Sequence, residues 1–197
     1  MKTSKMTIAD LDSIADKLET EYDDFWNYNI FKSELENDNS KYIVAKDNDN
    51  IVGFAGIWIA IDIAHITNIV VKKDCRKAGI GSLLLENLIE LCKKINTVEV
   101  TLEVNEHNAA AINLYKKFGF EHVGTRKKYY NNIDSALIMT KILNWIRQKA
   151  KRDGGFCLIF FHFPPSLLAL FLYRLNLVLN HSIRSFYSYC LPSFSTN

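Results

Sequence analysis

Residues 65–94 read HITNIVVKKDCRKAGIGSLLLENLIELCKK, and this stretch decides the predicted fold class. Its first part, His65 to Val71, is apolar and rich in β-branched residues, which is typical of a strand. The loop RKAGIG, residues 76–81, follows after a short polar break, and the apolar residues beyond it recur at helical spacing. A strand that runs through a glycine loop into a helix predicts an α/β fold.

The loop itself predicts a site for a diphosphate. Gly79 and Gly81 have no side chains, so successive backbone N–H groups can converge on an anion, and the dipole of the following helix favours negative charge. A plain glycine turn before a core helix fits this spacing equally well. The chain lacks both the GxxxxGK[ST] loop and the third glycine of a dinucleotide fingerprint, which disfavours ATP and NAD.

Similar patterns predict further elements on both sides of this stretch. Thr7 is a plausible cap for a first helix, and Gly119 is a natural residue to end the last one. The turn at residues 47–50 predicts a hairpin. The predicted helices are residues 7–18, 28–36, 82–94 and 108–118, and the other predicted strands are residues 42–46, 51–59, 98–104 and 135–142.

Four segments taken together resemble the GNAT acetyltransferase superfamily. They are HITNIVV, the R/Q-x-x-G-x-G/A loop as RKAGIG, LEVNEHNAAAINLYKKFGF and KKYYNNIDSALIM. Within the superfamily the chain is most similar to the bacterial RimI-type ribosomal-protein-alanine N-acetyltransferases. The resemblance covers residues 1–145 and implies a mixed central sheet, flanked by helices, in which two parallel strands splay apart.

The resemblance also implies acetyl-coenzyme A as co-substrate and no metal. The gap between the splayed strands would expose main-chain groups of Ile69, Val70 and Val71, which would pair with the pantetheine arm as an added strand does. Asn108 would also contact the coenzyme. The residues implied for the pyrophosphate are Lys77, Ala78, Gly79, Ile80, Gly81 and Ser82.

Glu103 and Tyr115 match the general base and general acid of the family. Glu103 lies in the apolar alternation VEVTLEV, where partial burial of a carboxylate would move its pKa toward working pH. A phenol is suited to protonate a departing thiolate. Without the resemblance, a strand glutamate is usually a solvent-facing residue and a helical tyrosine a core residue. Tyr129 and Tyr130 match a tyrosine pair that would wall a peptide slot, although aromatic packing on a sheet edge explains them almost as well.

The expected reaction is acetylation of the N-terminal amino group of a protein, with a ribosomal-protein alanine as the best substrate. An α-amino group titrates below lysine, so deprotonating lysine costs about 3 kcal/mol more at neutral pH, and a modest base suffices for a terminus. One alternative is acetylation of a small amine such as a polyamine or antibiotic. Another is a non-catalytic coenzyme-binding or membrane-tethered protein, which the presence of both Glu103 and Tyr115 disfavours.

Composition divides the chain into two parts. All 22 acidic residues lie at or before Asp153, and of the 24 basic residues only Arg174 and Arg184 lie after it. A main domain without net charge gives no indication of a nucleic-acid partner. The 4 cysteines form no CxxC pair, and the N-terminus has no apolar segment of the kind that directs secretion, so we expect a cytoplasmic protein.

Residues 146–197 are predicted to be a poorly structured, apolar extension. Two apolar runs, FCLIFFHF and LLALFLYRLNLVL, flank Pro164-Pro165. Neither run reaches the roughly 20 residues that cross a bilayer, and the proline pair would break a helix that joined them. We interpret the segment as an extension without selected structure, such as the product of a shifted reading frame. The rival interpretation is a membrane-associating hairpin.

Overall fold

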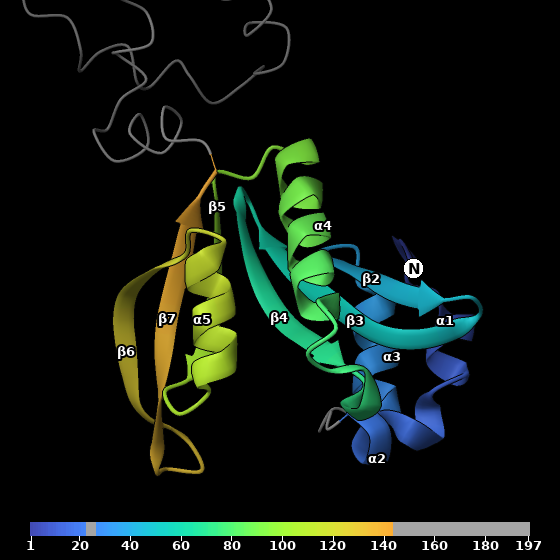
Figure 1. Ribbon diagram of the computed structural model, residues 1–197. Helices are drawn as coiled ribbons and strands as arrows, with labels where there is room; N and C mark the ends of the chain where they lie inside the picture. Colours follow the sequence, from blue (N-terminus) through green and yellow to red (C-terminus); the bar gives the residue numbers. More distant parts are fainter. Residues whose placement is uncertain (23–26, 144–197) are drawn as a thin grey trace, which may run out of the picture. The chain divides into compact units, whose positions relative to one another are not determined.

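The computed structural model describes residues 1–22 and 27–143 (Figure 1). The predicted extension at residues 146–197 lies outside this described part. In chain order the elements are β1 (Lys2–Lys5), α1 (Ile8–Asp12), η1 (Ala15–Lys17), α2 (Leu18–Tyr22), α3 (Tyr28–Glu36), β2 (Ser40–Asp47), β3 (Asn50–Ala60), β4 (Ile63–Val71), η2 (Lys73–Cys75), α4 (Ile80–Lys94), β5 (Glu99–Asn105), α5 (Ala109–Lys117), β6 (Glu121–Tyr130) and β7 (Asp134–Ile142).

The strands form one mixed sheet in the order β1-β2-β3-β4-β5-β7-β6. Among the strands of the described residues, only β4 and β5 are parallel neighbours, and they pair only from Ile63–Ile66 to Glu99–Leu102. Beyond this point β4 continues along β3 and β5 continues along β7, so the sheet opens between them (Figure 1). The predicted mixed α/β fold with splayed parallel strands is confirmed.

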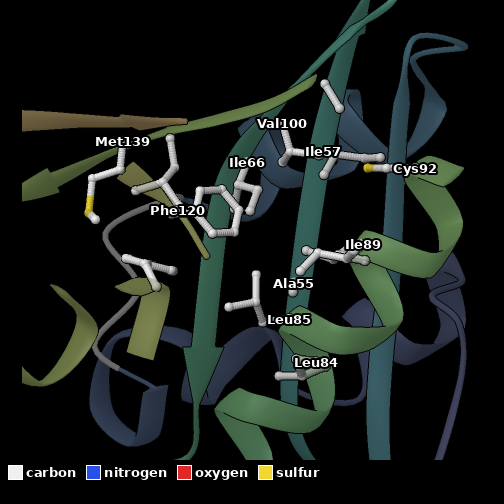
Figure 2. Close-up of a cluster of buried hydrophobic side chains, with 14 of the residues drawn as sticks. Ala55, Ile57, Ile66, Leu84, Leu85, Ile89, Cys92, Val100, Phe120 and Met139 are labelled. Atoms are coloured by element: carbon white, nitrogen blue, oxygen red, sulfur yellow. The ribbon is translucent and has the colours of Figure 1, made fainter. Parts of the chain in front are cut away.

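A hydrophobic core lies on each face of the sheet. On one face, called the α4 face, α4 and α5 cover the strands, and α4 contributes Leu84, Leu85 and Cys92 (Figure 2). On the other, called the α1–α3 face, the N-terminal helices surround Phe31 and Phe54, which are fully buried. Burial of each large apolar side chain contributes about 1.5–3 kcal/mol relative to exposure, so the two cores fix the sheet between two helical layers.

The first predicted helix is interrupted. It begins as predicted, because Thr7 and Asp10 form a reciprocal capping box. However, α1 ends at Asp12, and Ile14 has a φ of −122°, outside the helical range. Leu11, Ile14 and Leu18 are all buried, so packing against the sheet outweighs the continuous helical periodicity of the sequence.

Two strands were not predicted from the sequence, β1 and β6. Both lie at the edges of the sheet. The β1 sequence is polar, and most residues of β6 are exposed, so neither shows the apolar alternation that marks a strand. Pairing with β2 and β7, respectively, makes these segments extended.

Candidate active site

A cavity of about 810 Å³ opens where β4 and β5 separate. The end of β4, the start of α4, the end of β5 and the first turns of α5 surround it. Ala78 and Tyr129 do not line the cavity, although both were predicted site residues. The predicted residues that do line it are Ile69, Val70, Val71, Lys77, Gly79, Ile80, Gly81, Ser82, Glu103, Asn108, Tyr115 and Tyr130.

The open edge of β4 presents main-chain groups to this cavity. The N–H of Lys72 donates to the carbonyl of Val52 on β3 at 3.0 Å. Since hydrogen bonding alternates along an antiparallel pair, the main-chain groups of Val71 and Ile69 point away from β3, and those of Val70 point toward it. The Val71 carbonyl accepts from Arg76 Nε at 3.2 Å. Ile69 and Val71, rather than all three predicted residues, are therefore the ones placed to pair with an extended ligand.

The N-terminus of α4 offers a site for an anion. Gly79 is its N-cap with a φ of 82°, a left-handed conformation that favours glycine. The first helical hydrogen bond runs from Leu83 N–H to the Gly79 carbonyl, which leaves the N–H groups of the three residues between them without a helical partner. The first turn has no acidic residue, and apart from its own chain neighbours no described residue lies within 4 Å of the place where a Cβ of Gly79 would stand. These features suit a phosphate group.

Glu103 is held by partners from β6. Leu102 and Val104 pack into the core of the α4 face, so Glu103 between them points to the α1–α3 face. Its side chain is 12% exposed, and Oε1 lies 2.8 Å from Nη1 of Arg126. Tyr129 hydrogen-bonds to Glu103, which raises the pKa of Tyr129. No local pattern in the sequence indicated Arg126, because β6 shows no alternation.

Tyr115 approaches the gap from the opposite side. It lies on α5 within the core of the α4 face, and its ring centroid is 5.9 Å from that of Phe120. Burial raises the pKa of Tyr115 to about 12, and Tyr130 adds to this effect. The carboxylate and the phenol thus lie on opposite faces of the sheet, on either side of the opening between β4 and β5.

An irregularity in β4 adds two polar residues to the cavity lining. Gly56 pairs with Asn68 and Ile57 with Ile66, so Thr67 is an extra residue in the strand, as in a β-bulge. The hydroxyls of Thr67 and Tyr42 lie 3.0 Å apart. A Cβ at Gly56 would stand 2.1 Å from the Tyr42 ring, so glycine at this position of β3 leaves the room that the ring occupies. Thr67 and Asn68 were not among the predicted site residues.

The chain matches the model of the acetyltransferase (GNAT) family over residues 8–120. The chain belongs to the GNAT family. It is 37% identical over 141 residues to a Bacillus subtilis protein named putative [ribosomal protein bS18]-alanine N-acetyltransferase, covering 71% of this chain and 93% of that one. The predicted membership and its acyltransferase class are confirmed.

Solved structures agree with the assignment to the GNAT family. The ribosomal-protein-S18-alanine N-acetyltransferase from Escherichia coli superposes with a TM-score of 0.67 and 29% identity, covering 73% of this chain and 94% of that one. An aminoglycoside 6′-N-acetyltransferase complexed with coenzyme A shares the fold, with a TM-score of 0.63 and 19% identity over 72% of this chain and 97% of that one.

GNAT acetyltransferases use acetyl-coenzyme A, and the described residues provide groups that fit it: the open main chain of β4 and the N-terminus of α4. Within residues 1–22 and 27–143, no three His, Cys, Asp or Glu side chains are grouped so that they could hold a metal ion. None of the helices in the same ranges is long and apolar enough to cross a membrane.

Of the remaining predicted residues, Asn108 and Tyr130 line the cavity and Tyr129 does not. Asn108 is the N-cap of α5, and its Oδ1 accepts from Ala111 N–H at 3.1 Å. Its side-chain oxygen is thus already used in the protein, while its amide nitrogen is the group that can donate to a ligand. The rings of Tyr129 and Tyr130 meet edge to face, with centroids 5.1 Å apart, beside Glu103.

Proposed function

We propose that this GNAT enzyme transfers an acetyl group from acetyl-coenzyme A to the N-terminal amino group of a protein, with the N-terminal alanine of a ribosomal protein as its preferred acceptor. One observation carries the proposal: Glu103 and Tyr115 lie on opposite faces of the sheet at the opening between β4 and β5. The names of the Bacillus subtilis and Escherichia coli relatives support the choice of acceptor.

The coenzyme would lie along the open edge of β4. Its amide groups pair with the main-chain groups of Ile69 and Val71, as an added strand would. Its pyrophosphate binds the free N–H groups at the start of α4, where the helix dipole and Lys77 favour negative charge. This position directs the thioester into the gap between the strands.

The acceptor amine would enter from the face that carries Glu103. An α-amino group has a pKa of about 7.7–8.0, so a substantial fraction is neutral at physiological pH. Its nitrogen attacks the acetyl carbon, the carbon–sulfur bond breaks, and Glu103 accepts the proton released by the nitrogen. On the other face, the Tyr115 hydroxyl donates its proton to the leaving thiolate. Burial keeps this phenol protonated across the neutral range because its pKa is about 12.

The test is release of coenzyme thiol from acetyl-coenzyme A by the full-length chain. Peptides that begin with Ala, Ser or Met are compared with spermidine, using Glu103→Gln beside Glu86→Gln, an exposed glutamate on α4 that serves as the matched control. We expect turnover of the Ala peptide, a loss of about 10²–10⁴-fold in Glu103→Gln, and no loss in the control. Turnover of spermidine alone would replace the protein acceptor with a small amine.

A further inference from the structure

Asn68 shares a face of the sheet with Glu103. Phe54 pairs with Val70, and both side chains belong to the core of the α1–α3 face. Asn68 pairs with Gly56. Asn68 is two residues from Val70 on β4, and side chains two residues apart in a strand share a face, so the Asn68 side chain points to this same face. Glu103 also points there, because its neighbours in β5 pack into the core of the other face.

The side-chain amide of Asn68 has no hydrogen-bond partner among residues 1–22 and 27–143. Its Nδ2 and Oδ1 are both buried, and neither forms a hydrogen bond with any described residue. The neighbouring Thr67 hydroxyl is bonded to Tyr42, whereas Asn68 lines the cavity with a donor and an acceptor that no described residue uses. Since buried polar groups in native proteins are nearly always hydrogen-bonded, the missing partner is expected to be a ligand.

We propose that Asn68 is a positioning residue that binds the main chain of the second residue of the acceptor. Its Oδ1 accepts the N–H of the first peptide bond, and its Nδ2 donates to the carbonyl of the second residue, because the N–H and the C=O of one extended residue point to the same side. This inference rests on the proposed function, because the amine must lie on the face of Glu103 to lose its proton there.

The chemistry of an amide favours a peptide over the other candidate ligands. Coenzyme amides are served by the main chain of Ile69 and Val71, which points along the sheet rather than to the α1–α3 face. A polyamine has N–H groups but no carbonyl, so it leaves the Nδ2 donor of Asn68 unpaired. Asn68 therefore selects acceptors whose amino group is followed by a peptide bond.

The test compares two acceptors that differ in one group. One is a peptide that begins with Ala, and the other is the same peptide with an ester oxygen in place of the first amide N–H. We expect the full-length chain to prefer the amide by about tenfold in kcat/KM. Asn68→Ala should lose about tenfold on the amide and treat both acceptors alike, while its Kd for coenzyme A stays unchanged. Asn113→Ala, an exposed asparagine of α5 outside the cavity, is the matched control.

Each contrary result has a separate meaning. If the unaltered chain acetylates the amide and the ester acceptors at equal rates, this result alone overturns the proposed role of Asn68. Equal loss on both acceptors, or weaker binding of coenzyme A with the amide preference retained, would show a structural role instead. If Asn68→Ala does not fold, Asn68→Ser gives the same comparison. Turnover of spermidine but of neither peptide would refute the proposed function, and the role of Asn68 with it.

Discussion

Arg126 forms an ion pair with the carboxylate of Glu103. The ion pair joins β5 to β6, two strands that are separated by β7 in the sheet. The Arg126 side chain is 57% exposed, so the pair contributes little to stability, about 0–1 kcal/mol. Its guanidinium also lies 5.8 Å from the centroid of the Tyr129 ring, and the hydroxyl of Tyr129 donates a hydrogen bond to the same carboxylate. The main effect of Arg126 is to fix where Glu103 points.

The raised pKa of Tyr115 predicts that the stability of the folded chain depends on pH. Its pKa rises from 10.0 to about 12 in the folded chain, so only the unfolded chain releases this proton between those values. The contribution is fully present below pH 10 and is lost as the pH rises, by about 1.4 kcal/mol per unit at most. Urea unfolding at about pH 9 and about pH 11 should show a smaller loss in Tyr115→Phe than in the unaltered chain. Equal losses would contradict the burial of this phenol.

The loop and first turn of α4 form the element that fits phosphate best. Lys77 and Gly79 both adopt left-handed backbone conformations, with φ values of 64° and 82°. This geometry turns the chain from η2 into the helix and leaves the N–H groups of the first turn directed at the cavity. Of the two glycines in the motif, only Gly79 has a positive φ. Gly81 lies inside the helix, where alanine is allowed.

Alanine should therefore have opposite effects at these two glycines. Gly79→Ala keeps an open site for its Cβ but retains the left-handed strain, and we expect the free energy of unfolding to fall by about 1–2 kcal/mol. In Gly81→Ala the Cβ meets Leu114 Cδ2 at 3.5 Å, an ordinary contact, and we expect a gain of about 0.5–1 kcal/mol. Urea unfolding of both variants checks this. A loss of similar size at both positions would contradict the conformational difference.

Among the described residues, the strands of the sheet lie within residues 2–142, and those that line the cavity run from Tyr22 to Tyr130. A chain that ends at Asp153 therefore contains all of the elements described. We expect it to fold and to keep its kcat/KM for an Ala peptide within about twofold of the full-length chain. Loss of folding or of activity would show that residues 154–197 are required.

The sequence by itself determined the elements that depend on local chemistry. Helical periodicity, the Thr7 cap, the glycine loop and Gly119, which has a φ of 81°, involve residues a few positions apart. Such patterns therefore predicted α3 with its observed bounds. They also predicted a diphosphate site in the loop between β4 and α4, which stays a prediction. Glu103 and Tyr115 came from the resemblance to the GNAT family, and their roles stay predictions.

Only the tertiary structure decided which side chains meet around the gap. Arg126 reaches Glu103 because strands distant in sequence lie close in the order β5-β7-β6. Asn68 has no side-chain partner among the described residues, and it lies just beyond the point where β4 and β5 stop pairing, after Ile66 and Leu102. The physical reason is that strand pairing joins residues far apart in the chain, so no local pattern records which groups it brings together or leaves open.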